Sequence, residues 1–406
     1  MDYDILSIQE KSSTTKAEAG KISANKNQQI QRHGVRRFAD GKVFQTSRLG
    51  SASQDRLISD TKEWGGPGTT HEFGFAPKHT EARNGAVANE ILLQNFTEGL
   101  DILNSQHPNF VFTGQCTVQQ QDVSLKSSYG LDLKTTGGFC EWYFTYQRKG
   151  SGNMIDGFLA ETGAKVDIKK EIQTHSAFLK MQNKIATVKN GTMPVLFVEA
   201  MQPLSKLLES FYIHKYSEGA ALYSGKMGEK LFSDKITLVD SAYDPDSGAI
   251  RFFDGEGIVR TEDLTLIDKG RFNGLMSDLR FGRKFNKAST GNGQRVYNRG
   301  VTLGPRSLRF QKGQESWKKI VGQLDRCLIA MVSAGGDSND LGEFSSPVQI
   351  GYIMEKGEVI GQAPQVTVKT SIENYLGKGL IGVSSDGFTT YSPSACLISE
   401  MEVLVN

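Results

Sequence analysis

The clearest hydrophobic pattern of the chain lies at residues 191–229. Met193–Val198 is an apolar run long enough for a buried strand, and Pro203 suits the first turn of a helix. Apolar side chains then recur at helical spacing, on Leu204, Leu207, Leu208, Phe211 and Tyr212. With Gly219 as a stop, this pattern predicts a strand, an amphipathic helix and a small-residue loop at Ser224–Glu229.

Alternating polar and apolar positions predict strands in much of the N-terminal half. Residues 2–48 have this pattern, and Asp40-Gly41 marks a tight hairpin turn within them. Phe110–Tyr146 is also strand-like, with a turn at Ser127–Gly130. Residues 60–80 are rich in glycine and predict a long loop, and helical spacing predicts helices at Val87–Leu103 and at residues 155–183.

The C-terminal half mixes both periodicities. Helical spacing predicts a short helix at Leu275–Lys287 and an amphipathic helix from Trp317 to Met331, ended by Gly335-Gly336. Strand-like runs follow at Val348–Met354, Val366–Thr370 and Ala395–Val405, after an earlier one at Lys235–Val239.

Interspersed strands, helices and hairpins indicate an α+β fold with mixed or antiparallel sheets and packed helices, rather than a doubly wound parallel sheet. The 406 residues are enough for two large domains. The break at Lys189-Asn190-Gly191 predicts an N-terminal domain of residues 1–188 and a C-terminal domain of residues 189–406.

Composition places the chain among soluble proteins. No apolar run approaches the roughly 20 residues of a membrane helix, and the acidic, strand-like N-terminus is unlike a signal peptide. Four cysteines lie far apart without a CxxC pair: Cys116, Cys140, Cys327 and Cys396. The sequence therefore predicts a cytoplasmic protein with reduced, mostly buried thiols.

Charge is unevenly distributed along the chain. Lys269–Lys319 contains thirteen Lys and Arg residues but only two acids, Asp278 and Glu315, and aromatic residues are interleaved with the cations. Such a run marks either a solvated face with core aromatics, which we favour, or a surface for nucleic acid.

The usual catalytic and metal-binding motifs are not found. The helix after Pro203 carries one histidine, His214, off its apolar face, and Glu209 has no histidine beside it. His71-Glu72 lacks the second histidine that would complete a zinc motif. We therefore predict no catalytic residue and no metal ligand in this chain.

An ordered series of glycine-rich motifs gives the chain a family resemblance. The series comprises Ser224–Glu229, Phe253–Gly257, Leu266–Gly270, Ser289–Arg295, Gly342–Ser345, Gly351–Ile353 and Pro393–Ala395. It resembles the TldD/PmbA family, also called modulators of DNA gyrase. The resemblance covers residues 190–406 and, more weakly, residues 26–140, and the helix that usually precedes the first strands of the family is missing.

The resemblance implies a two-domain member of a cytoplasmic peptidase complex. In that family the TldD branch carries HExxxH on the helix before the SGxxGE loop and a cysteine near the C-terminus, whereas the TldE/PmbA branch lacks these ligands and pairs with TldD. Here the helix lacks HExxxH, and Gly379–Gly387 contains no cysteine. The chain thus resembles the TldE/PmbA branch.

A non-catalytic subunit is the leading functional hypothesis. It implies a TldD-like HExxxH partner that holds the zinc, a peptide substrate, and a homo-oligomer when the chain is alone. Glycine-rich turns that allow close backbone approach supply candidate residues for peptide or partner binding, namely Ser224, Gly225, Asp254, Glu256, Gly257, Asn292 and Arg295. Two alternatives stay open: an autonomous peptidase with an unrecognised site, and a regulatory or nucleic-acid-binding protein that uses residues 269–319.

Overall fold

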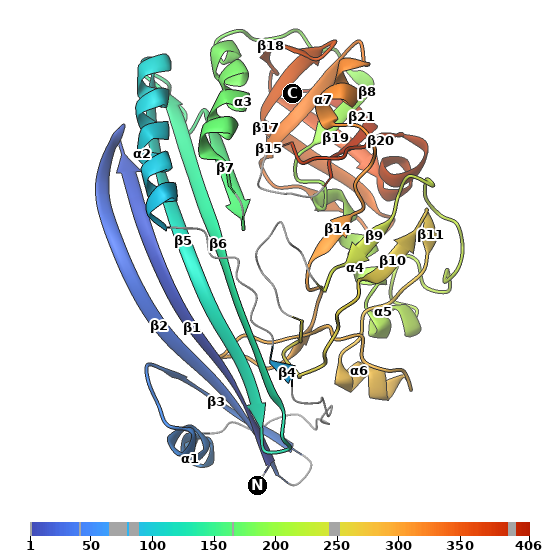
Figure 1. The fold of residues 1–406 in the computed structure, drawn as a ribbon. Coiled ribbons are helices and arrows are strands. Elements are labelled where there is room, and N and C mark those ends of the chain that lie inside the picture. The colour runs from blue at the N-terminus through green and yellow to red at the C-terminus, as the bar shows by residue number, and fades with distance from the viewer. Residues whose placement is uncertain are drawn as a thin grey trace.

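A long, curved sheet dominates the N-terminal half of the molecule (Figure 1). The computed structural model describes residues 2–39, 42–64, 79–80, 89–164, 166–242, 252–388 and 395–406. In spatial order the strands of this sheet are β3 (Lys42–Leu49), β2 (Lys21–Ala39), β1 (Asp2–Glu18), β5 (Phe110–Ser127), β6 (Asp132–Arg148) and β4 (His79–Thr80), and β7 (Gly157–Gly163) also pairs with β6.

The two faces of the long sheet bury different partners because side chains alternate along each strand. Phe112, Trp142 and Phe144 lie under two helices, α2 (Asn89–Gln106) and α3 (Ile168–Met181). Ile5 packs with residues of a third helix, α1 (Gln54–Trp64), whereas the next residue along the strand, Leu6, points to the other face. That second face packs against Phe252 and Phe253 of the C-terminal half.

The C-terminal half is built around a ring of five strands. They follow one another as β15 (Cys327–Ser333), β8 (Gly191–Phe197), β21 (Leu397–Val405), β19 (Val366–Ser371) and β17 (Glu343–Glu355). The ring closes because β17 pairs with β15 as well as with β19. Three further strands extend it: β16 (Asp337–Ser338), β18 (Glu358–Gln362) and β20 (Leu380–Val383).

Smaller elements follow β8 in the sequence and precede β15. The strands are β9 (Leu238–Asp240), β10 (Leu264–Asp268), β11 (Arg271–Phe272), β12 (Gly293–Gln294), β13 (Thr302–Leu303) and β14 (Leu308–Phe310). The helices are η1 (Gln202–Leu204), α4 (Ser205–Ser210), α5 (Ile213–Ser217), α6 (Leu279–Lys284) and α7 (Trp317–Gly322), and a π-helical turn, η2 (Asn374–Lys378), follows β19.

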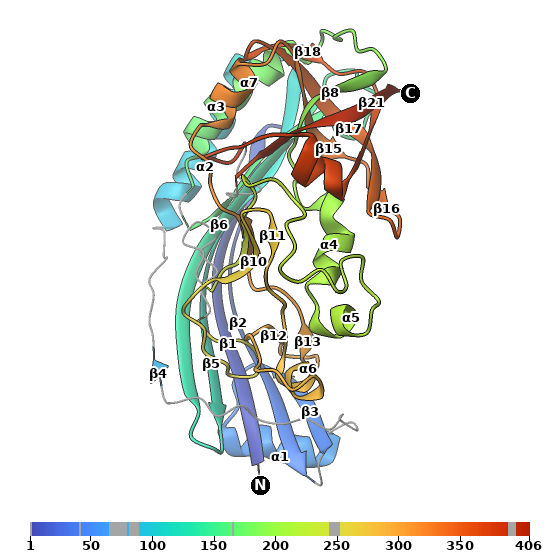
Figure 2. The ribbon, with the colours of Figure 1, turned by 90° about the vertical axis from the view of Figure 1, so that its right-hand side faces the viewer.

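Helix α3 connects the long sheet to the ring, as the side view in Figure 2 illustrates. On one side, Ile172 belongs to the core under α2. On the other side, the ring of Phe178 meets that of Tyr352 edge-on, with 5.0 Å between centroids. The hydroxyl groups of Tyr146 and Tyr352 lie 3.3 Å apart across the same junction. The two halves are therefore in buried contact around α3.

The α+β fold class and most predicted strands are confirmed. Strands β1–β3 cover residues 2–49, and Ala39 pairs with Lys42 across the predicted hairpin, whose turn residues Asp40 and Gly41 lie outside the described residues. The four cysteines are buried and free, as expected. The domain boundary at residues 188 and 189 stays a prediction.

Four helix predictions need correction. Residues 157–163 of the predicted helix 155–183 form β7, because they pair with β6. The predicted helix from Trp317 to Met331 stops at Gly322, and its second half is β15. The helix after Pro203 is broken at Phe211 and Tyr212, and the helix predicted at 275–287 shrinks to α6. The first residues of the loop predicted at 60–80 belong instead to α1, which ends at Trp64. Residues 65–78 of that prediction lie outside the described residues.

Candidate functional site

Helix α4 is where the resemblance would place a zinc motif, and its side chains do not fit zinc. The carboxylate of Glu209 accepts a hydrogen bond from Lys215 Nζ at 2.8 Å, and Lys206 Nζ lies 2.9 Å from Asp340. Within the described ranges, no three His, Cys, Asp or Glu side chains gather as a metal site would require. Zinc sites need three or four such donors, and the described side chains around α4 do not supply them.

His214 lies in an aromatic stack instead of a ligand set. Its ring is stacked on Phe281, with 4.3 Å between centroids, and also stacks with Tyr212 at 6.0 Å. Burial lowers the pKa of His214 below the ordinary value for histidine. The stack therefore holds α5 against α6, which is a structural use of this histidine.

Ser224 and Gly225 form a local turn, apart from the other predicted site residues. Ser224 Oγ accepts a hydrogen bond from the N–H of Ala221 at 3.2 Å. Gly225 is exposed and has a φ of +80°, which explains why glycine stands there. The turn is thus accounted for by its own backbone geometry.

Four other predicted residues come together in a buried polar network between the two halves. They are Asp254, Glu256, Asn292 and Arg295, all at most 4% exposed. The link to the long sheet is Arg295, whose guanidinium donates to Asp4 Oδ1 on β1 at 2.7 Å and to the carbonyl oxygen of Gly34 on β2 at 2.8 Å. The Asp4 carboxylate also accepts a hydrogen bond from Arg36 Nε at 2.9 Å.

Burial and neighbouring charges shift the pKa values of the groups in this network. Burial by itself raises the pKa of Asp4, but Arg295 and Arg36 outweigh it and hold that pKa below its ordinary value. Burial lowers the pKa of Arg295 to about 10, so this side chain keeps its charge at neutral pH. The network is therefore a buried ion-pair cluster that depends on each of its members.

Gly34 allows the halves to approach closely at this point. A Cβ atom on Gly34 would lie 2.2 Å from the backbone oxygen of Tyr297. Only a residue without a side chain lets the segment that carries Arg295 lie against β2. The close approach also brings the Gly34 carbonyl within reach of the Arg295 guanidinium.

Asp254 fixes the backbone of the glycine-rich motifs. Its carboxylate accepts hydrogen bonds from the N–H groups of Glu256, Ile258 and Gly293, each at 2.9 Å. Burial, together with the nearby charge of Glu256, raises the pKa of Asp254 to about 6. At Gly257, φ is +91° and a Cβ would lie 2.6 Å from Leu131 Cδ2, so glycine is required there too.

Asn292 joins this network to a second buried acid, Asp240. Asn292 Nδ2 donates to Asp240 Oδ2 at 2.7 Å and to the Gly304 carbonyl at 3.0 Å. Asp240 also receives Arg260 Nη2 at 2.7 Å and the backbone N–H of Arg306 at 2.7 Å. Four members of this network were not predicted as site residues: Asp4, Arg36, Asp240 and Arg306. The signal for Asp4 was a charge among the apolar residues of the first strand, which carries no information about its distant partner.

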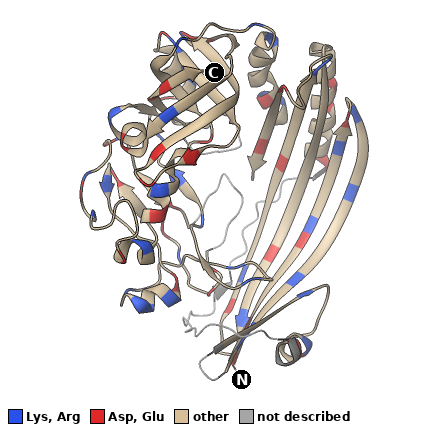
Figure 3. Ribbon diagram, turned by 180° about the vertical axis from the view of Figure 1, so that it is seen from behind, with Lys and Arg blue, Asp and Glu red and all other residues tan. Residues whose placement is uncertain are grey.

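Part of the basic run at 269–319 is engaged in contacts within the chain. Arg295 and Arg306 donate to backbone carbonyls, and three further cations pair with acids outside or inside the run: Lys284 with Glu218, Arg309 with Asp263, and Lys319 with Glu315. Figure 3 shows further cations on the short helix α6, which includes Arg280 and Arg283. This distribution favours a solvated face over a nucleic-acid surface.

We expect the chain to bind duplex DNA only weakly, because at least five of the thirteen cations are engaged within the chain and the protein has a net charge of only +2. Arg280→Glu/Arg283→Glu/Lys284→Glu should therefore leave DNA affinity unchanged within a factor of about 3 in a fluorescence anisotropy titration at physiological salt. Submicromolar binding that the triple variant abolishes would restore the nucleic-acid hypothesis.

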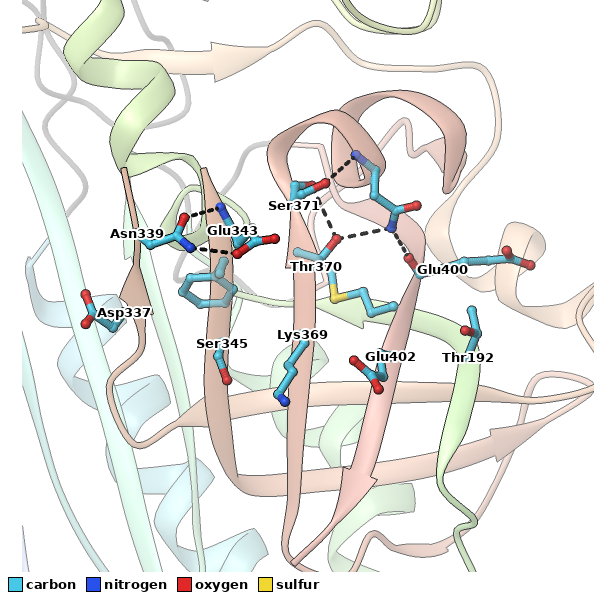
Figure 4. A pocket seen from close by; sticks show the side chains of 13 residues that line it. Thr192, Asp337, Asn339, Glu343, Ser345, Lys369, Thr370, Ser371, Glu400 and Glu402 are labelled. Atoms are coloured by element: carbon cyan, nitrogen blue, oxygen red, sulfur yellow. Dashed lines mark hydrogen bonds between the residues drawn. The ribbon is translucent and has the colours of Figure 1, made fainter. Parts of the chain in front are cut away.

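A shallow pocket of about 660 Å³ lies on the outside of the ring (Figure 4). One row of paired residues crosses five neighbouring strands in it: Asp337, Ser345, Lys369, Glu402 and Thr192. This row can form hydrogen bonds and ion pairs with a polar surface. Among the residues lining it, the structure shows no nucleophile hydrogen-bonded to a histidine base, so it has no visible hydrolytic machinery.

No helix in the described parts of the chain is both long and apolar enough to cross a membrane.

Comparison with known proteins finds matches for both the sequence and the fold. The family model of the PmbA/TldA metallopeptidase C-terminal domain matches residues 190–404. An uncharacterised protein of Methanocaldococcus jannaschii is 24% identical over 343 residues, covering 80% of this chain and 78% of that protein. A metalloprotease TldD homolog of Haemophilus influenzae is 27% identical over 180 residues, covering 40% of this chain and 37% of its own. The fold is similar to that of TldE from Thermococcus kodakarensis, with a TM-score of 0.85, 20% identity, and coverage of 100% of this chain and 97% of that one.

Proposed function

Because this chain belongs to the PmbA/TldD metallopeptidase family through residues 190–404, we propose that it is a non-catalytic, TldE/PmbA-like subunit of a peptidase complex. Its partner is a TldD-like chain that carries HExxxH and holds the zinc. The complex processes or degrades unfolded peptides in the cytoplasm.

The single observation that carries this proposal is the chemistry of α4. In the position of the family's metal helix, the chain has an ion pair between Glu209 and Lys215. Amide hydrolysis by a metallopeptidase requires a metal-activated water with a general base beside it. In this chain the ammonium group of Lys215 lies 2.8 Å from the Glu209 carboxylate. That carboxylate is therefore engaged in an ion pair and does not stand beside a metal-bound water as a general base.

The buried network supports a structural role for most of the predicted site residues. Asp254, Asn292 and Arg295 already have partners within the chain. Their contribution to the complex is then to hold the two halves in a fixed arrangement, against which a peptide and the partner bind. Extended peptides bind to exposed sheet edges through backbone hydrogen bonds.

The proposal is tested by measuring cleavage of an unfolded peptide by this chain, by a TldD-like HExxxH protein, and by their mixture. We expect no cleavage by this chain alone, and cleavage by the mixture. The variant His214→Ala should retain full activity in the mixture, because His214 packs in the aromatic stack with Phe281.

Two results would overturn the proposal. One is chelator-sensitive cleavage by the isolated chain that His214→Ala or Glu209→Gln abolishes. The other is one zinc per chain by elemental analysis after extensive dialysis. Either would show a metal site that the described residues do not form, and would favour the autonomous peptidase.

A further inference from the structure

A cavity of about 220 Å³ lies between the long sheet and the loops of the C-terminal half. One wall comes from β5 and β6, through residues that include Val123, Thr135 and Phe139. The opposite wall comes from Ala242 and from the glycine-rich motif that contains Phe253 and Asp254. The cavity thus lies beside the buried network, and Asp254 and Arg306 belong both to the network and to the cavity wall.

The size of the cavity limits what it can hold. Pockets for drug-sized molecules measure about 300–1,000 Å³, so this cavity is smaller than a typical ligand site. It has room for one large side chain. Val123, Phe139, Phe253 and Ala242 present apolar surface to that space. The uncharged polar residues of the lining are Gln121, Thr135, Ser241, Gln294 and Ser307.

The charged groups in the lining already have hydrogen-bond partners in the backbone. Asp254 accepts three backbone N–H groups, and Arg306 donates to the carbonyl oxygens of Gly291 at 2.6 Å and Ile258 at 3.0 Å. A charged occupant would lose its hydration and meet a carboxylate and a guanidinium that are both engaged. An uncharged occupant avoids that cost, and its apolar surface gains by leaving water.

We propose that this cavity binds one uncharged, mainly apolar side chain, aromatic or large aliphatic, of an extended peptide. This inference rests on the proposed function in that it takes peptides as the ligands. It adds a preference: among unfolded peptides, those with an exposed Phe, Tyr or Leu are held by this subunit, while Lys or Glu at that position is rejected.

The test is a fluorine NMR titration with N-acetyl-4-fluoro-L-phenylalanine amide as the probe. For a ligand of this size we expect saturable binding with a Kd on the order of 1 mM. Thr135→Met and Ala242→Leu fill the cavity from opposite walls, and each should weaken binding at least ten-fold. Thr145→Met, on the same strand and outside the cavity, should leave binding unchanged.

Competition tests the charge preference in the same experiment. N-acetyl-leucine amide should displace the probe, whereas N-acetyl-lysine amide and N-acetyl-glutamate amide should not. Lack of saturable binding by the wild-type chain, or equal binding by a folded cavity-filled variant, would overturn the inference. Because no partner or cleavage is involved, such a failure would leave the mixing experiment of the proposed function standing, and the reverse also holds.

Discussion

Replacing Arg295 by Met is expected to lower the free energy of unfolding by about 3–5 kcal/mol, the usual cost of breaking a buried ion pair from one side. The loss removes the donors to Asp4 Oδ1 and to the Gly34 carbonyl. Met has a similar length but offers no N–H group, so the carbonyl of Gly34 stays buried without its partner. Urea denaturation followed by circular dichroism measures the change.

An exposed arginine four residues further along the chain provides the control. Arg299→Met should change the free energy of unfolding by less than about 0.5 kcal/mol, as surface substitutions usually do. Combining Arg295→Met with Asp4→Asn should destabilise less than the two single changes added together, since the two side chains are partners. A loss below about 1 kcal/mol for Arg295→Met would mean that the halves are held mainly by apolar contacts.

Glu161→Gln is expected to stabilise the protein at pH 8 and to have little effect near pH 4.5. Glu161 lies on β7 and is 7% exposed, with its Oε2 accepting hydrogen bonds from Trp142 Nε1 at 3.2 Å and from the N–H of Asp167 at 2.8 Å. Burial, helped by the nearby charges of Glu171 and Asp167, raises the pKa of Glu161 from 4.5 to about 7. An amide oxygen can accept the same two hydrogen bonds without carrying a charge.

The sign follows from proton binding in the two states. Between pH 4.5 and about 7 the folded chain holds a proton on Glu161 that the unfolded chain has lost. The contribution of Glu161 to stability therefore falls as pH rises through this window, by up to about 3 kcal/mol, and is constant outside it. Subtracting the unfolding free energies of wild type and Glu161→Gln at several pH values removes the effects of other groups, including Asp254. A difference that does not change with pH would show that Glu161 titrates normally.

The misassigned helix at Trp317–Met331 shows why apolar spacing alone cannot locate the end of a helix. Its apolar residues fit a helical face, and Trp317–Gly322 does form α7. Cys327–Met331 is instead buried on both faces, because Leu328 contributes to one core and Ile329 to the other. A strand buried on both sides reads as a continuous apolar run, which periodicity cannot distinguish from a buried helix.

The break between α4 and α5 comes from a contact distant in sequence. The Phe211 carbonyl accepts a hydrogen bond from the N–H of Met276 at 2.7 Å, and the N–H of Ile213 donates to the Met276 carbonyl at 3.1 Å. In a continuous helix, the Phe211 carbonyl and the N–H of Ile213 would instead form hydrogen bonds within the helix. Local propensity favoured one helix, and pairing with a strand-like segment about sixty residues later, at Met276, divided it.

The candidate site was predictable only in part for a similar reason. The glycine-rich motifs point to residues around 254–257 and 289–295, which the structure brings together. Their charged partners on the long sheet, Asp4 and Arg36, belong to ordinary alternating strands. Nothing in local spacing distinguishes a strand aspartate that faces solvent from one that receives a buried arginine.

The order of strands in the ring has a consequence for how the chain is made. β21, the last strand, lies between β8 and β19, and β8 begins at Gly191. During synthesis at roughly 5–20 residues per second, β8 waits on the order of tens of seconds before β21 leaves the ribosome. Both edges of β8 are open to pairing with other nascent chains until β15 is made, and the edge that β21 covers stays open until the end of the wait. A chain that stops before Leu397 should therefore aggregate, because β8 and β19 then lack the strand that lies between them.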